Sequence, residues 1–200
     1  MVTKRITITL MEEMLGTSPA NPELYSDFIA ANRPDGADPA EAESLPTLDE
    51  EIKQGMTVFT RMDGTDSPPC LWDYQLKGFF KDSCGCLDRV PDTQSSKLKA
   101  YKKVIDGLIF VKPRKIALTL PKDAKIGICE RPLRAQTAQG ERVALARSET
   151  VPAGTSFTFE VQMLSDAHQK LLDEWMEYGQ LRGLGQWRNS GKGRFTFKYE

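Results

Sequence analysis

The stretch Gly183-Leu184-Gly185-Gln186-Trp187-Arg188-Asn189-Ser190-Gly191-Lys192-Gly193-Arg194-Phe195 places two Gly-x-Gly pairs around a polar, cationic centre. Glycine readily adopts positive φ and lets a backbone approach another surface closely. Arg188, Lys192 and Arg194 add positive charge beside backbone N–H groups, a combination that suits an anion such as a phosphate. The same spacing is also typical of an ordinary glycine-rich turn between a helix and an edge strand.

The segment that precedes this stretch has clear periodicity. Residues 156–164 alternate strictly between apolar and polar side chains, which predicts a strand. Ser165 or Asp166 can cap a helix that continues to about Tyr178, and Gly179 is expected to end it. The apolar face of this helix is predicted to contain Leu164, His168, Leu171, Leu172, Trp175 and Met176.

Residues 195–199 alternate again, so the chain ends as strand, helix, glycine-rich stretch and strand. This order is half of a ferredoxin-like β-α-β-β-α-β fold. The other half is predicted from a strand over 3–10, a helix beginning near 76–86, and strands over 108–111 and 115–120. We therefore predict an α+β fold with a ferredoxin-like core, an arrangement that RNA-recognition domains share. The 200 residues suit a single domain, 1–200, that carries insertions.

Two insertions into this core are predicted. Residues 33–52 are rich in proline and acidic side chains and form an acidic loop, which follows a short helix over 22–30. Residues 129–150 form a β-hairpin whose two arms carry arginines, namely Arg131, Arg134, Arg142 and Arg147. A basic hairpin suits a nucleic-acid contact arm, and it equally suits an ordinary exposed hairpin.

The formal net charge is −1, but the charge is distributed unevenly along the chain. Residues 1–52 carry −8 and residues 53–200 carry +7. Such asymmetry is typical of a basic functional face beside an acidic segment, although acidic loops also serve solubility. No apolar run is long enough to cross a bilayer, and the alternating N-terminus predicts a strand rather than a signal peptide. We therefore expect a cytoplasmic protein with no membrane partner.

The chain has 4 cysteines, namely Cys70, Cys84, Cys86 and Cys129. In the cytoplasm they are expected to be free thiols rather than a disulfide framework. A zinc site built from the Cys84-Gly85-Cys86 pair and the other two cysteines stays open as an alternative, but the spacing differs from that of C-x-x-C knuckles. We predict no metal and no cofactor.

With the glycine-rich stretch in this context, the chain resembles the RAMP superfamily of CRISPR-associated proteins. Gly183-Leu184-Gly185 and Gly191-Lys192-Gly193 match the glycine-rich loop that these proteins carry between the last helix and the last strand. Residues 151–155 resemble the family's entry into its third core strand. Leu76-Lys77-Gly78 resembles the turn that opens the first core helix in backbone subunits of effector complexes, which line up along a guide RNA.

The resemblance implies a protein that self-associates along single-stranded RNA and binds its backbone. The predicted contacts combine motif positions and neighbouring cations: Lys77, Lys81, Arg131, Arg134, Arg142, Arg147, Gly183, Gly185, Trp187, Arg188, Gly191, Lys192, Gly193 and Arg194. Trp187 is expected either to stack on a base or to anchor the loop against the helix. Tyr74 and Gln75 depart from the family, which favours serines that touch RNA there.

The predicted partners are therefore single-stranded RNA or DNA, together with either further copies of the chain or CRISPR effector subunits. Residues 10–30 also resemble small prophage proteins, so a second hypothesis is a phage-encoded mimic that blocks an effector complex, an anti-CRISPR. A third hypothesis is an RNA-processing endoribonuclease with His168 as general acid or base, although a histidine there more often packs or caps a helix. We predict no enzymatic activity.

Overall fold

The central sheet has four antiparallel strands. The computed structural model describes residues 1–20, 56–137 and 140–200. Its central sheet consists of β1 (Val2–Leu10), β7 (Ile109–Lys112), β11 (Ser156–Met163) and β12 (Phe195–Tyr199), in the order β12-β1-β11-β7. Every neighbouring pair is antiparallel. Numbered along the chain, these strands lie in the order 4-1-3-2, the arrangement of a β-α-β-β-α-β core.

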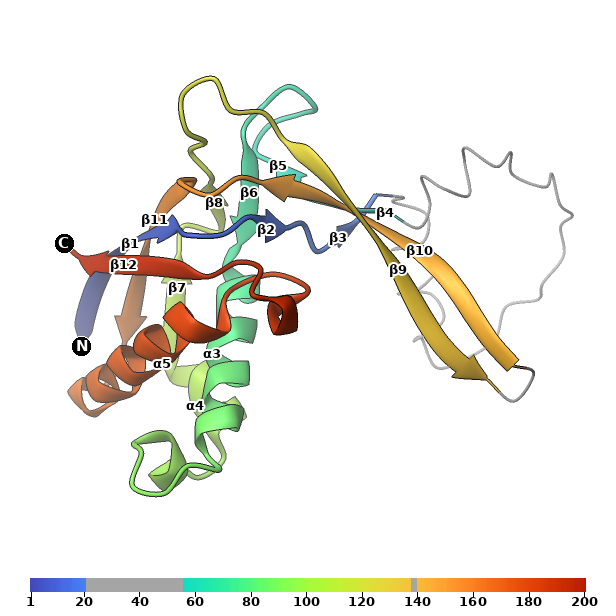
Figure 1. The fold of residues 1–200 in the computed structure, drawn as a ribbon. Helices are drawn as coiled ribbons and strands as arrows, with labels where there is room; N and C mark the ends of the chain where they lie inside the picture. Colours follow the sequence, from blue (N-terminus) through green and yellow to red (C-terminus); the bar gives the residue numbers. More distant parts are fainter. Residues whose placement is uncertain (21–55, 138–139) are drawn as a thin grey trace, which may run out of the picture.

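Helices cover one face of this sheet, as Figure 1 shows. α3 (Asp73–Leu87) and α4 (Tyr101–Leu108) precede β7, and α5 (Gln169–Arg182) connects β11 to β12. Three short 3-10 turns accompany them: η1 (Ser95–Lys97), η2 (Asp166–His168) and η3 (Arg188–Ser190). The predicted α+β fold with a ferredoxin-like core is confirmed.

The hydrophobic core lies between the sheet and the helices α3 and α5. Alternation along β1 buries Ile6 and Ile8 completely, as the period-2 pattern of a half-buried strand requires. From the helices, Phe80 of α3 stacks on Trp175 of α5 with ring centroids 5.6 Å apart, and both side chains are 0 % exposed. Full burial of an aliphatic or phenyl side chain stabilises the fold by about 1.5–3 kcal/mol. This packing fixes both ends of the glycine-rich stretch, because α5 precedes it and β12 follows it.

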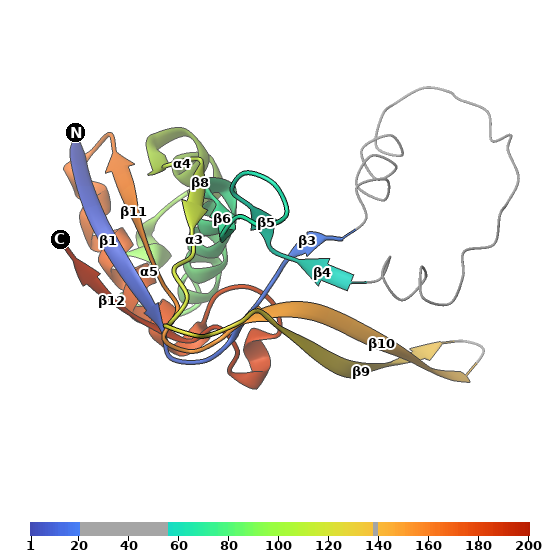
Figure 2. The same ribbon diagram turned by 90° about the horizontal axis from the view of Figure 1, so that it is seen from above.

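The remaining strands form two smaller sheets. The first contains β2 (Met14–Leu15), β3 (Ser18–Pro19), β4 (Met56–Val58), β9 (Gly127–Thr137) and β10 (Gly140–Val151). The second contains β5 (Thr60–Arg61), β6 (Pro69–Trp72) and β8 (Lys115–Ala117). β9 and β10 are the predicted hairpin, which projects away from the helices and the central sheet (Figures 1 and 2).

The end of α5 differs from the prediction, because Gly179 does not end the helix. It lies within α5 against two rings, and a Cβ at this position would be 2.4 Å from Phe79 Cζ and 2.6 Å from Phe195 Cζ. The helix ends instead before Gly183, whose φ is +81°. Leu164 was predicted on the buried face but is 44 % exposed, because it precedes the first helical turn.

The smaller sheets contain short strands. β4 and β5 are divided at Phe59, whose side chain is buried in the core. The strands on the two sides of Pro113 belong to different sheets, since β7 joins the central sheet and β8 pairs with β6. The helix predicted over 22–30 and the acidic loop over 33–52 lie outside the described residues. Among the described helices, none is long and apolar enough to cross a membrane.

Candidate nucleic-acid interface

The glycine-rich stretch folds its two Gly-x-Gly pairs against each other. The N–H of Leu184 donates to Gly193 O at 2.9 Å, and the N–H of Gly193 donates to Glu13 O at 2.8 Å. Gly193 has a φ of +72°, and a Cβ there would lie 2.0 Å from Leu184 O. Gly183 is equally restricted, with a φ of +81° and Lys192 O at 2.5 Å from its ideal Cβ. The glycines therefore allow a close crossing of two backbone segments, which a side chain would prevent.

Several backbone amides of this loop form internal hydrogen bonds and are therefore not open to a ligand in the way the sequence suggested. Besides the two bonds above, the N–H of Gly183 donates to Gly179 O at 2.8 Å and the N–H of Gly191 donates to Arg188 O at 2.9 Å. Gly185 packs on the segment after β1, since its ideal Cβ would be 2.8 Å from Leu15 O. These bonds give the loop a defined shape.

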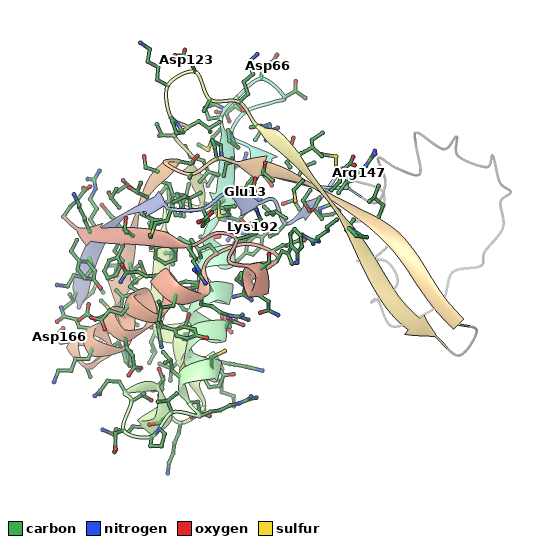
Figure 3. The ribbon with its side chains drawn as sticks, in the orientation of Figure 1. Glu13, Asp66, Asp123, Arg147, Asp166 and Lys192 are labelled. Carbon is green, nitrogen blue, oxygen red and sulfur yellow. The ribbon has the colours of Figure 1, made fainter. Side chains whose placement is uncertain are left out.

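Two of the three cations in the loop form internal ion pairs. Arg188 reaches Asp82 of α3, with Nη1 at 2.7 Å from Oδ2 and Nη2 at 3.3 Å from Oδ1. Lys192 lies beside Glu13, as Figure 3 shows, and donates a hydrogen bond to its carboxylate. This hydrogen bond raises the pKa of Lys192. Arg194 is exposed and forms no ion pair with another described residue.

The two lysines of α3 contact the last turn of α4 and the start of β7. Lys81 Nζ lies 2.6 Å from Asp106 Oδ1, and Lys77 Nζ donates to Asp106 O at 3.2 Å. Lys77 Nζ also lies 4.9 Å from the ring centroid of Phe110. Surface pairs of this kind are individually weak, about 0–1 kcal/mol, so a phosphate can compete for these lysines.

The hairpin meets the glycine-rich loop through Arg131. Its guanidinium carbon lies 4.9 Å from the ring centroid of Trp187, and its Nη2 donates to Gln186 Oε1 at 3.1 Å. Its Nε and Nη1 atoms are buried and have no hydrogen-bond partner among the described residues. Trp187 is 40 % exposed, so its ring is partly covered and partly open. The structure thus brings Arg131 of the predicted hairpin into contact with Trp187 of the predicted glycine-rich loop.

The register of the hairpin places the four predicted arginine positions on two faces. Arg131 is opposite Ala146, Arg142 is opposite Ala135, and the register places positions 131 and 142 on one face of the hairpin. Positions 134 and 147 fall on the other face. Arg147 lies near the base of the arm in Figure 3 and pairs with Glu130, with Nε 2.8 Å from Oε1. The side chains of Arg134 and Arg142 lie outside the described part.

The open face of the central sheet is polar. Thr7 and Thr158 are partners in the β1–β11 register, and their hydroxyls are 2.6 Å apart. Among the central strands, Phe110 is the one aromatic side chain that points away from the buried face. RNA-recognition domains stack two or three bases on aromatic side chains of this face. This chain therefore has the strand order of an RNA-recognition domain but not the aromatic base-stacking surface on its sheet.

A groove that the sequence reasoning missed lies beside the first turn of α3. Thr17, Ser18, Pro19, Thr60, Trp72, Tyr74, Gln75 and Arg114 line a cavity of about 640 Å³. The rings of Trp72 and Tyr74 are stacked with centroids 6.0 Å apart and an angle of 18° between their planes. Arg114 Cζ lies 5.7 Å from the Trp72 ring. In the sequence, this groove could have been found from the aromatic pair Trp72 and Tyr74, which lies shortly before Leu76-Lys77-Gly78.

A second cavity lies beside the glycine-rich loop and has two lining residues in common with this groove. It has a volume of about 190 Å³ and is lined in part by Gly185 and Arg188. Thr17 and Gln75 line both cavities, and the Gln75 Nε2 donates to Thr17 Oγ1. The hydrogen-bonded pair of Thr17 and Gln75 therefore lies at the boundary of both cavities.

Neither any of the four cysteines nor His168 is among the described residues that line the two cavities. All four thiols are free, and the described residues contain no group of three or more His, Cys, Asp or Glu side chains that could hold a metal ion. Burial raises the pKa of both Cys70 and Cys84. His168 precedes α5, whose 14 residues separate it from the glycine-rich loop by about 20 Å.

Comparison with known proteins identifies a fold relative among solved structures. No protein family and no curated protein matches the sequence. The chain is similar to a chain in the cryo-EM structure of the Type III-B Cmr-beta bound to cognate target RNA, with a TM-score of 0.54 and 13 % identity. The match covers 99 % of this chain and 60 % of that one, so this protein spans three fifths of its neighbour's length. A chain of a Type IV-B CRISPR complex aligns with a TM-score of 0.46 and 11 % identity, over 100 % of this chain and 90 % of that one. The first similarity shows that the fold is shared.

Proposed function

We propose that this chain is a RAMP-like protein that binds single-stranded nucleic acid, with RNA as the preferred ligand, and self-associates along the strand. The contact between Arg131 and Trp187 is the observation that carries this proposal. It joins the hairpin to the glycine-rich loop and presents a half-open indole beside a guanidinium. The neighbour, a chain in the structure of the Type III-B Cmr-beta bound to cognate target RNA, shares the fold and supports the same ligand class.

The chemistry at this contact suits a sugar–phosphate backbone. A buried charged donor without an acceptor costs about 1–3 kcal/mol or more, and Arg131 has two such nitrogens among its described surroundings. A phosphate oxygen that reaches the guanidinium would relieve this cost. The open part of the Trp187 ring can stack on a base without sequence preference, which stabilises a complex by about 1–3 kcal/mol per base.

The test is binding of a fluorescein-labelled uridine 20-mer across a salt series. We expect the affinity to fall as salt rises, with a slope of about −0.7 per phosphate contact for a single strand. Arg131→Ala should weaken binding and reduce the slope by about 0.7. Arg89→Ala is the matched control, because this exposed arginine follows the far end of α3 and should leave binding unchanged. No binding at low salt by the wild-type protein would refute the proposal.

Self-association is tested separately by mass. Repetition of one heterologous contact produces an open stack, whose length follows that of the strand. We expect the complex to contain more copies as the oligonucleotide lengthens from about 10 to 40 nucleotides, with a fixed site size per copy. One copy on strands of every length would remove self-association from the proposal and leave strand binding in place.

The internal ion pairs favour a second candidate, an interaction protein that mimics a backbone subunit. Arg188 is neutralised by Asp82, Lys192 by Glu13 and Arg147 by Glu130, so much of the predicted positive charge is already compensated. A phage-encoded mimic with this surface would occupy a subunit position in a CRISPR effector complex without binding the guide tightly. Capture of effector subunits from a CRISPR-bearing host lysate, by a protein that binds no RNA alone, would favour this candidate over the first.

We propose no catalytic role for the chain. His168 lies at the opposite end of α5 from the glycine-rich loop, so a strand held at Trp187 would not reach it without extending along the whole helix. We expect the protein to leave a bound RNA intact over hours. RNA cleavage by the wild-type protein that His168→Ala abolishes would support the endoribonuclease hypothesis instead.

A further inference from the structure

We propose that a group of exposed lysines beyond the end of α3 binds the acidic segment 35–51 of a second copy of the chain, an inference that rests on the proposed function. We call this group the lysine patch, and it consists of Lys97, Lys99, Lys102 and Lys103. All four residues are exposed. In the part of the chain that the structure describes, none of the four side chains has a hydrogen bond, an ion pair or a ring contact. The patch is therefore a local concentration of positive charge that a negatively charged partner can neutralise.

The backbone that carries the lysine patch is fixed by the core. Ser95 of η1 is fully buried, its N–H donates to Glu174 Oε2 at 2.9 Å, and its hydroxyl accepts from Trp175 Nε1 at 3.0 Å. Leu98 and Tyr101 pack against the hydrophobic core. The apolar side chains of this segment thus face inward and its lysines face outward. A partner finds the charges already in place, which lowers the entropy cost of binding.

The carboxylates of the neighbouring elements do not neutralise the patch. Asp106 of α4 pairs with Lys81, with Oδ1 2.6 Å from Nζ. Glu174 accepts its hydrogen bonds from the backbone and the hydroxyl of η1. Asp88 and Asp92, in the turn after α3, are exposed and form no ion pair with another described residue. The positive charge of the patch is therefore left for a partner from outside this copy.

The sequence of the chain itself contains a segment of the matching charge. Residues 35–51 contain seven acidic side chains and no lysine or arginine. The acidic residues are Asp35, Asp38, Glu41, Glu43, Asp49, Glu50 and Glu51. A segment with a charge of −7 and a patch of four lysines attract each other, and this attraction weakens when salt screens it.

The places of the patch and of the flanks of this segment favour a contact between copies. The flanks meet where the N–H of Ala20 donates to Met56 O at 2.9 Å, next to β3 and β4. This region lies beside the start of α3, because Gln75 donates to Thr17 Oγ1. The patch lies beyond the other end of α3, and 15 helical residues span about 22 Å (Figure 1). Repetition of one contact between two different parts of the surface produces an open stack, as the proposed self-association requires.

Carbodiimide crosslinking tests this contact, because it joins a carboxylate to a lysine amine without a spacer. The experiment uses equal amounts of unlabelled and ¹⁵N-labelled full-length protein, without nucleic acid, and mass spectrometry of the crosslinked peptides. We expect peptide pairs that join the lysine patch to residues 35–51 and that contain one labelled and one unlabelled peptide. Their yield should fall as salt rises from about 0.1 M to about 1 M, because the Debye length decreases from about 10 Å to about 3 Å.

A variant that combines Lys99→Glu with Lys103→Glu should lose these mixed pairs. The matched control combines Lys122→Glu with Lys125→Glu, because these two lysines are also exposed and lie between β8 and β9, where Figure 3 labels Asp123. Both variants should keep a Tm close to that of the wild-type protein. Mixed pairs that persist in the patch variant would overturn the proposal. Pairs of one isotope alone, or no pairs in the wild-type protein, would overturn it as well.

Strand binding separates this inference from the proposed function. On a uridine strand of about 10 nucleotides, close to the site of one copy, the patch variant should bind as tightly as the control variant, which has the same net charge. On a strand of about 40 nucleotides, it should form complexes with fewer copies than the control. Weaker binding of the short strand than by the control would assign the lysines to the strand and overturn the proposal. Mixed pairs from a wild-type protein that binds no strand would support the contact and refute the proposed function.

Discussion

The crossing of the two Gly-x-Gly pairs leads to a specific prediction for Gly193→Ala. Gly193 combines a φ of +72° with an ideal Cβ position 2.0 Å from Leu184 O, a distance that no real Cβ contact reaches. An alanine here therefore carries left-handed backbone strain and also forces the two loop segments apart. Gly191 is a matched control in the same loop, because its φ is +85° and its nearest neighbour to a new Cβ is Arg194 Cζ at 3.7 Å.

The magnitude follows from the contacts that each variant loses. Left-handed backbone costs a non-glycine residue about 1–2 kcal/mol, and both variants carry this cost. Separation of the loop segments in Gly193→Ala also breaks the bond from the Leu184 N–H to Gly193 O and the bond from the Gly193 N–H to Glu13 O. Each contributes about 1 kcal/mol net. We expect a loss of unfolding free energy of about 3–4 kcal/mol for Gly193→Ala and about 1–2 kcal/mol for Gly191→Ala.

The assay is urea unfolding followed by tryptophan fluorescence, since Trp175 is fully buried in the core and reports its loss. The difference between the two variants, about 2 kcal/mol, corresponds to about 4–8 °C in Tm for a chain of this size. Gly78→Ala in α3 is a second control, because no atom lies within 4 Å of its ideal Cβ, and it should not destabilise the protein. Equal losses in Gly193→Ala and Gly191→Ala would refute the reasoning, because steric overlap at the crossing would then add nothing.

Three further predictions concern charge and protonation. Asp82→Asn removes the carboxylate that pairs with Arg188 and Arg182. We expect the free energy of unfolding in urea to fall by about 1–2 kcal/mol and the uridine 20-mer to bind more tightly. Unchanged binding would show that the freed arginine does not reach a phosphate. Burial, reinforced by the hydrogen bond to Asp173, raises the pKa of Tyr199 above its unfolded value of about 10, so stability present below pH 10 is lost as the pH rises further. Tyr199→Phe should flatten this alkaline decline in Tm, and parallel pH profiles for the two proteins would contradict the assignment. Burial raises the pKa of Cys70 and Cys84, so a thiol reagent at pH 8 should modify them only after the protein unfolds in urea. Rapid labelling of either thiol in the folded protein would contradict their placement in the core.

Local patterns in the sequence were sufficient for the main elements of the fold. Strict alternation predicted β1, β11 and β12, and the arginine-rich arms around Gly140 predicted the hairpin β9–β10. The glycine spacing correctly marked a loop between the last helix and the last strand. These predictions succeed because side-chain periodicity and glycine conformation depend on residues that are near one another in the chain.

The sequence alone did not reveal which charges remain available for a ligand. Arg188 and Asp82 are 106 positions apart, and Lys192 and Glu13 are 179 apart, so no local pattern relates them. The helix end was misplaced for the same reason, because Gly179 is required by the rings of Phe79 and Phe195 rather than by a cap.

The sequence by itself determined that the chain has a ferredoxin-like core, a basic hairpin and a glycine-rich loop before its last strand. Only the tertiary structure decided how these parts form a surface. It paired most of the loop cations with carboxylates, placed Arg131 on Trp187, and assembled a groove from Thr17, Thr60, Trp72 and Arg114. The physical reason is that secondary structure follows from local dihedral and burial preferences, whereas a binding surface depends on which distant side chains the folded core brings into contact.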